Sequence, residues 1–165
     1  MSDLSTKPNL RPVALDDESF LFDVFASNWE DECAALPNQN LVTHFLRIQY
    51  TAEQSRFDAR FPRLERYVVL DDDGEPVGRF YLQFSEPLVQ CIDMTLLPKY
   101  RDNGIGQRVL GALLDCAASK GFSVTMRVAR RNQRAMAFYR RAGFRMVTMD
   151  DLDVYFEWSP SPDGH

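Results

Sequence analysis

Cysteine, histidine and long apolar runs are scarce in this 165-residue chain, and each scarcity argues against a class of protein. The three cysteines, Cys33, Cys91 and Cys116, are widely spaced and form no C-x-x-C pair, so we expect neither a disulfide framework nor a metal site. No apolar run approaches the roughly 18 residues that cross a bilayer, and the first residues lack the apolar stretch of a signal peptide. These absences favour a cytoplasmic protein without a membrane partner.

The length and the composition fit one globular domain. Apolar residues make up 45% of the chain, enough for one core, and the charged share of 26% is close to the globular average. Residues 1–9 and 159–165 are polar and aperiodic, so we expect them to form flexible tails around a domain over residues 10–158.

Charge is distributed unevenly along the chain. Between Lys99 and Arg145 there are 11 basic and two acidic residues, so this stretch carries +9 and the remainder −14, within a total of −5. Such asymmetry indicates that one part of the protein meets an anion and that another attracts a cation. The alternative is that two solvated faces differ by chance.

Apolar periodicity predicts the element order β-α-α-β-β-β-α-β-α-β-β. The expected strands cover residues 11–15, 67–70, 77–84, 89–97, 124–128, 144–149 and 154–158. Hairpins between the early strands and helices between the later ones predict an α/β sandwich with a mixed sheet, antiparallel first and partly parallel in its centre. Strict alternation in the strand over residues 89–97 places these side chains together on one face: Cys91, Asp93, Thr95 and Leu97.

The most informative stretch, residues 96–108, is a strand end, a glycine turn and a helix start in succession. Gly104 and Gly106 permit positive φ angles, and the first N–H groups of a helix are unpaired at a pole worth roughly +0.5 charge. This geometry suits a diphosphate. Residue 109 is Val and no Gly-Lys-Ser/Thr follows, so dinucleotide and Walker-type sites are disfavoured. A tight turn that merely uses glycine is the alternative.

A second motif follows 26 residues after Gly106 and runs from Asn132 to Phe144. Arg101-x-x-Gly104-x-Gly106 followed by Asn132-x-x-Ala135-x-x-Phe138-Tyr139-x-x-x-Gly143-Phe144 resembles the two cofactor motifs of the GNAT superfamily of acyl-CoA-dependent N-acyltransferases. The resemblance covers residues 11–158. It implies a single-domain α/β fold of three layers, in which helices flank a mixed, centrally splayed β-sheet.

The resemblance also implies that acetyl-CoA is the cosubstrate, and it implies where acetyl-CoA binds. Leu96 and Leu97 would pair with the pantetheine arm as an added strand, and Asn132 would either hydrogen-bond pantetheine or act only as a helix cap. Phe138 either joins this set or packs in the core, and Tyr139 would lie near the sulfur. The residues that would wrap the pyrophosphate are Arg101, Asp102, Asn103, Gly104, Ile105, Gly106 and Gln107.

Acyl transfer to an amine needs a base, a stabilised oxyanion and a proton for the thiolate. Asp93 is the first candidate base and Glu86 the second, whereas the alternative for Asp93 is a polar residue that satisfies a strand end. The N–H of Leu96 or of Leu97 is the candidate that polarises the carbonyl. Tyr139 is the candidate acid, with packing beside its phenylalanine neighbour as the alternative.

A nucleophilic triad is disfavoured because His44 lies on a predicted helix and His165 at the terminus, so direct attack by the amine is the simpler scheme. We therefore expect an acetyl-CoA-dependent N-acetyltransferase that acts on a primary amine of a small molecule or peptide. The alternative is a non-catalytic acyl-CoA-binding or regulatory module with the same fold.

Partners are predicted from the remaining charges and strand edges. The side chains that we expect to contact the acceptor come from the first two helices and the late strands. Many of them are acidic, which favours a cationic acceptor. Nucleic acid is disfavoured by the overall acidity, despite two arginine pairs at residues 130–131 and 140–141, and exposed edge strands favour a homodimer. The acidic residues are Asp16, Asp17, Glu30, Asp31, Glu32, Asp150, Asp151 and Asp153.

Overall fold

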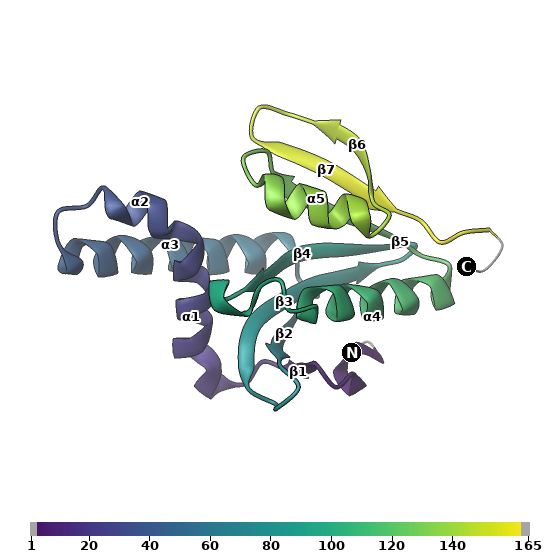
Figure 1. The fold of residues 1–165 in the computed structure, drawn as a ribbon, viewed down its shortest axis with the longest axis horizontal. Helices are drawn as coiled ribbons and strands as arrows, with labels where there is room; N and C mark the ends of the chain where they lie inside the picture. The colour runs from purple at the N-terminus through teal and green to yellow at the C-terminus, as the bar shows by residue number, and fades with distance from the viewer. Residues whose placement is uncertain (1–2, 163–165) are drawn as a thin grey trace.

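Seven strands form one mixed sheet in the computed structural model, which describes residues 3–162 (Figure 1). The strands are β1 (Leu10–Pro12), β2 (Glu65–Leu70), β3 (Pro76–Ser85), β4 (Leu88–Leu96), β5 (Ser123–Ala129), β6 (Arg145–Met149) and β7 (Asp153–Trp158). Their order in the sheet is β1-β2-β3-β4-β5-β7-β6, and only β4 and β5 among these neighbours run parallel. The expectation of an antiparallel beginning and a parallel centre is confirmed.

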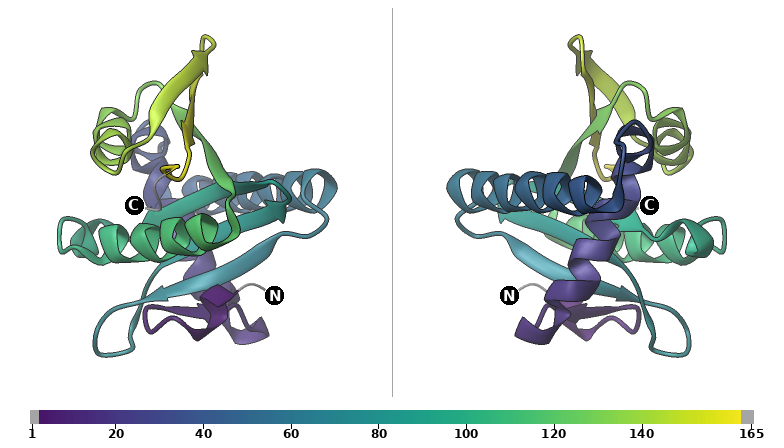
Figure 2. Two further views of the ribbon diagram at one scale, coloured as in Figure 1. Left: turned by 90° about the vertical axis from the view of Figure 1, so that its right-hand side faces the viewer. Right: turned by 90° about the vertical axis from the view of Figure 1, so that its left-hand side faces the viewer.

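Helices cover both faces of the sheet and complete three layers, as the resemblance implies. The helices are α1 (Glu18–Ala26), α2 (Glu30–Ala34), α3 (Gln39–Arg60), α4 (Ile105–Lys120) and α5 (Gln133–Arg141). Figures 1 and 2 show α4 and α5 on one face and α1 and α3 on the other. The short helix α2 was not expected.

The main core lies between the sheet and α4. The apolar stripe of α4 consists of Val109, Leu110, Leu113 and Ala117, which recur at helical spacing and are buried against the strands. Gly121 ends α4 with a left-handed φ of 71°, as a C-terminal glycine does, so that expectation is confirmed. The packing fixes the position of the other end of α4, where the candidate site lies.

The chain start differs from the flexible tail expected over residues 1–9. Asp3–Thr6 forms a 3₁₀ helix, and Leu4 is completely buried in the main core. Burial of an apolar side chain favours an ordered segment, and composition alone does not reveal such a contact. Residues 1, 2 and 163–165 lie outside the described part of the chain, so the last three residues of the second expected tail are not covered. Within residues 3–162, the helices are all too short or too polar to span a membrane.

Candidate functional site

The sheet opens in the middle of β4. The first four residues of β4, Leu88 to Cys91, pair with residues 123–126 of β5, and the pairing then stops. At the same point the register between β3 and β4 shifts, because Tyr81 lies opposite Asp93 and Leu82 lies opposite Cys91, which leaves Ile92 as an extra residue. A bulge of this kind bends its strand and re-aims the side chains that follow. The central splay is therefore built at Ile92.

The bulge corrects the expected faces of β4. Cys91 packs in the main core on the α4 side, whereas Asp93 turns to the other face and forms an ion pair with Arg79. Alternation predicted Cys91 and Asp93 together on one face, and this was wrong because the extra residue at Ile92 shifts the period by one. The acidic group thus faces α3, and the thiol faces the core beneath α5.

The N-terminus of α4 lies next to the end of β4 and is open. The turn uses left-handed backbone at Asp102, with φ 65°, and at Gly104, with φ 82°. Gly106, which also permits a positive φ, does not use one: it is helical and lies inside the first turn of α4. Gly104 is the N-cap residue and has no side chain to cap α4, and a Cβ on it would meet no described atom within 4 Å. The first N–H groups of α4 are thus available to an anion.

Basic side chains surround this turn. Arg134 of α5 pairs with Asp102 at 2.7 Å and so ties α5 to the turn. Burial, followed by the charge of Arg134, lowers the pKa of Arg101. An anion bound at the turn would offset the repulsion between these two arginines. Two further residues of the predicted site are exposed. Asn103 lies in the same turn, and Gln107 lies in the first turn of α4.

Leu96 and Leu97 have different backbone environments. The Leu97 N–H donates to the Val77 carbonyl at 2.9 Å, so it is not free to polarise a thioester, and that part of the expectation is wrong. Because Leu97 bonds to Val77 and hydrogen-bonded pairs alternate along an antiparallel ladder, the next pair, Leu96 and Gly78, is a non-hydrogen-bonded one, so the Leu96 N–H and carbonyl point away from β3 and into the splay. Arg101 Nε already donates to that carbonyl at 3.1 Å. Leu96 therefore offers the free N–H in this pair.

The side chains predicted on α5 gather on the α4 side of the splay. The Asn132 Oδ1 caps α5 by accepting from the Ala135 N–H at 3.1 Å, which leaves its Nδ2 group as a donor. The rings of Phe138 and Tyr139 meet edge to face, and Phe138 also lies beside Gly106 at the start of α4. Asn132 is thus a helix cap that keeps a donor for a ligand.

Tyr139 is buried and only 5% exposed. Burial raises the pKa of its phenol well above 10, and the nearby Cys91 and Asp93 raise this pKa further. Tyr139 is therefore protonated at neutral pH and lies near the point where β4 leaves β5. A protonated phenol can donate a proton, and the raised pKa makes Tyr139 a weaker acid than an exposed tyrosine.

Asp93 belongs to a buried charge cluster that sequence reasoning missed. Arg79 is 1% exposed; its Nε donates to Asp93 at 2.6 Å, and its two terminal nitrogens donate to Glu53 of α3 at 3.0 Å each. Thr95 also donates to Asp93, to the same Oδ2 oxygen as Arg79. Burial raises the pKa of Glu53 despite the attraction of Arg79. The one signal in the sequence was Arg79 itself, an arginine inside an apolar strand.

The other ionisable candidates lie elsewhere. Glu86 is exposed in the turn before β4, about seven residues or roughly 23 Å along the strand from Asp93, so it is excluded as a base at the splay. His44 is exposed on α3, and His165 lies outside the described residues. The expectation that Glu86 is a second candidate base was wrong because the first part of β4, Leu88 to Cys91, separates it from the splay.

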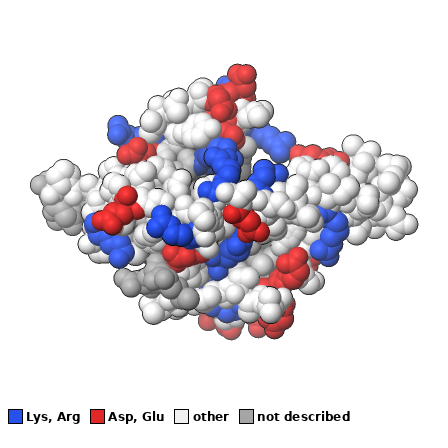
Figure 3. All heavy atoms as spheres, turned by 180° about the vertical axis from the view of Figure 1, so that it is seen from behind, with Lys and Arg blue, Asp and Glu red and all other residues white. Residues whose placement is uncertain are grey.

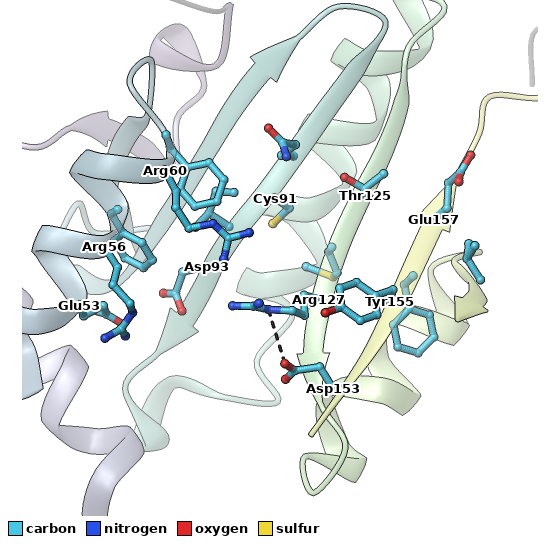
Figure 4. Close-up of a pocket in the computed structure, with 17 residues that line it drawn as sticks. Glu53, Arg56, Arg60, Cys91, Asp93, Thr125, Arg127, Asp153, Tyr155 and Glu157 are labelled. Atoms are coloured by element: carbon cyan, nitrogen blue, oxygen red, sulfur yellow. Dashed lines mark ion pairs between the residues drawn. The ribbon is translucent and has the colours of Figure 1, made fainter. Parts of the chain in front are cut away.

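A cavity of about 520 Å³ lies on the α3 side of the splay (Figure 4). It reaches Cys91 and Met126, the last residues that pair between β4 and β5. Asp93 lines it, and so does Asp153, the only one of the eight expected substrate-binding acids to do so. Figure 3 shows that basic side chains gather around a hollow near the centre of the molecule's back face.

The fold and the site define a class. The fold has three layers and a centrally splayed sheet. Beside the splay lies a helix that begins at a glycine turn, and a cavity lies on the opposite face. These are the features expected of a GNAT-type acyltransferase. The sequence profile described as the Acetyltransferase (GNAT) family matches residues 25–144, and this chain belongs to that family.

The chain is also similar in sequence to individual proteins, one of them a named acetyltransferase. The peptidyl-lysine N-acetyltransferase YjaB of Salmonella typhimurium is 30% identical over 113 residues, which cover 67% of this chain and 72% of the relative. The uncharacterized protein ML0378 of Mycobacterium leprae is 42% identical over 146 residues, which cover 86% of this chain but only 39% of that protein.

Solved structures show the same fold. The PaiA N-acetyltransferase of Thermoplasma acidophilum, crystallised with coenzyme A, superposes with a TM-score of 0.69 at 20% identity and covers 91% of this chain and 97% of its own. The ribosomal-protein-S18-alanine N-acetyltransferase of Escherichia coli superposes with a TM-score of 0.62 at 15% identity and covers 91% and 92%.

Proposed function

We propose that this protein transfers an acetyl group from acetyl-CoA to a primary amine by direct attack of the amine on the thioester. The observation that carries the proposal is the open N-terminus of α4 beside the splay of β4 and β5. It offers amides for a diphosphate on one face, while the cavity on the other face leads an acceptor to the same opening. The family to which the chain belongs supports this activity.

On this proposal, backbone groups hold the cosubstrate. The N–H groups of Ile105, Gly106 and Gln107 at the start of α4 would receive the diphosphate, where helix-dipole charge and unpaired donors coincide. Asn132 Nδ2 and the Leu96 backbone would bind the pantetheine arm, which would enter the splay as an extra strand between β4 and β5. The Leu96 N–H would also polarise the thioester carbonyl.

The chemical step then uses two side chains. The amine nitrogen forms a bond to the carbonyl carbon, the carbon–sulfur bond breaks, and the thiolate takes the proton of the Tyr139 phenol. Solvent later restores that proton. Asp93 would take the proton that the amine loses, at its Oδ1 oxygen, since Arg79 and Thr95 both donate to Oδ2. Arg79 fixes the position of this carboxylate.

The experiment that tests the proposal is thiol release from acetyl-CoA over a panel of amines, with the acetylated product identified by mass. We expect thiol release that depends on the amine, with one acetylated product per thiol. Binding of coenzyme A without amine-dependent thiol release from any amine would favour the alternative, a non-catalytic acyl-CoA-binding module.

A further inference from the structure

Three arginines line the proposed acceptor cavity, and they come from two walls. Arg56 and Arg60 lie four residues apart on α3, so they share one face of that helix, and Arg127 comes from β5. Figure 4 shows Arg60 and Arg127 reaching into the cavity from opposite sides. The cavity therefore presents guanidinium groups where an acceptor would pass.

These arginines differ from the buried Arg79 in how their charge is neutralised. Arg79 holds two carboxylates through hydrogen bonds of 3.0 Å or less. Arg127 Nε lies 3.7 Å from Asp153 Oδ2, which is too long for a hydrogen bond. In residues 3–162, Arg56 and Arg60 lie within ion-pair distance of no carboxylate, although Arg60 packs over the Phe61 ring. Their donors are available to a ligand.

The acids that line the cavity neutralise these arginines only in part: Asp153 lies 3.7 Å from Arg127, and Glu53 attracts Arg56. Glu53 and Asp93 are already bound to Arg79, and the remaining two, Asp153 and Glu157, both belong to β7 on the far wall. The forked donors of a guanidinium match a carboxylate or a phosphate, which they bind through two parallel hydrogen bonds. The α3 wall thus suits an anionic group, and the splay at Asp93 suits an amine.

We propose that the acceptor carries a carboxylate or a phosphate in addition to its amine, and that Arg60 and Arg127 bind this anionic group. The inference rests on the proposed function, since it identifies the substrate class of the same cavity. It differs from the cationic acceptor expected from the sequence, and seven of the eight acids behind that expectation lie outside the cavity.

Matched acceptor pairs test the inference. Each pair joins an anionic amine to a neutral counterpart: an amino acid and its carboxamide in one arm, phosphoethanolamine and ethanolamine in the other. The two arms distinguish a carboxylate from a phosphate. We expect kcat/KM to favour the anionic member about tenfold or more in one arm, as charge-assisted hydrogen bonds to a guanidinium imply. Equal use of both members, or preference for the neutral member, in both arms would overturn the inference.

Arginine variants identify the residues. Arg60→Gln and Arg127→Gln should each remove most of the preference, with the KM of the anionic member rising and its kcat less affected. The matched control is Arg47→Gln on the same helix, because the Arg47 guanidinium lies over the Phe22 ring, 3.7 Å from its centre, outside the cavity. Thermal unfolding checks that the three variants are folded. An unchanged preference in both cavity variants would contradict the role of these arginines.

A binding measurement separates this inference from the proposed function. If coenzyme A binds but no amine in the panel releases thiol, the proposed function fails, and calorimetry of the same amines with the coenzyme A-bound protein then decides the inference. Tighter binding of the anionic member that is lost in Arg60→Gln and Arg127→Gln supports it. Equal binding of both members, or binding that both variants leave unchanged, overturns it.

Discussion

Alanine at position 104 would place a methyl group on the open side of the turn that precedes α4. Gly104 has a φ of 82°, and a left-handed backbone costs an L-residue roughly 1–2 kcal/mol. Alanine also lowers the conformational entropy of the unfolded chain, which stabilises the folded state by about 0.4–1 kcal/mol and offsets part of that cost. The net cost of Gly104→Ala is therefore about 1 kcal/mol, which lowers Tm by about 2–4 °C in a chain of this length.

Gly121 supplies a matched control at the other end of the same helix. Its φ is 71°, and a Cβ there also meets no atom within 4 Å, so Gly121→Ala should lower Tm by a similar amount. Only the methyl group at residue 104 lies beside the open amides. Its interference with one charge-assisted hydrogen bond, worth roughly 1.5–3 kcal/mol, should weaken coenzyme A binding about tenfold or more.

Calorimetric titration of coenzyme A into both variants provides the assay. The expected result is a weakened affinity in Gly104→Ala and an unchanged affinity in Gly121→Ala, with similar thermal destabilisation in both. Equal affinities in the two variants would refute the assignment of the diphosphate to the start of α4, since the strain at the two glycines is comparable.

Three further predictions concern single side chains. Tyr139→Phe should lower kcat about tenfold or more while coenzyme A affinity stays the same, because only the proton donor is lost. Glu53→Gln leaves Arg79 with one charged partner and should lower the free energy of unfolding by about 3 kcal/mol in a urea titration. Hydrogen bonds from Arg11 lower the pKa of Asp17, so the stability that Asp17 provides is present above its unfolded pKa of about 3.9 and is lost as pH falls through the lower folded pKa.

Each of these three predictions has a control variant or a result that would contradict it. An unchanged kcat in Tyr139→Phe would remove this residue from the chemical step. Asp58→Asn breaks an exposed pair with Arg66 and should cost less than about 1 kcal/mol, so a similar loss in Asp58→Asn and Glu53→Gln would contradict the buried-cluster argument. For Asp17, the stability difference between wild type and Asp17→Asn should shrink below about pH 4, and a constant difference would count against the linkage.

Local chemistry in the sequence predicted much of the fold and part of the site. Gly104 was predicted from the turn that it permits, and Asn132 from its capping preference, because both properties depend on neighbours along the chain. The bulge at Ile92 was not predictable, since alternation assumes a regular strand and an extra residue leaves no mark on composition. It decided on which face Asp93 lies.

Contacts between residues far apart in the sequence were the other feature that the sequence could not predict. Glu53 and Arg79 are 26 residues apart, on a helix and on a strand, and only the packing of α3 on the sheet brings them together. Acids of the first two helices and the late strands were expected at the acceptor, yet only Asp153 among them lines the cavity, together with arginines of α3 and β5 and three acids outside that set. A count of charges cannot show which wall each side chain reaches.

The central claim is that backbone amides at the start of α4 bind the diphosphate of coenzyme A. Its most direct test is calorimetry of the purified protein with coenzyme A and with pantetheine, which keeps the thiol arm but lacks the diphosphate and the nucleoside. The claim predicts that coenzyme A binds about 100-fold more tightly than pantetheine, since at least two charge-assisted hydrogen bonds are lost. No measurable heat with coenzyme A, or equal affinity for the two compounds, would contradict it.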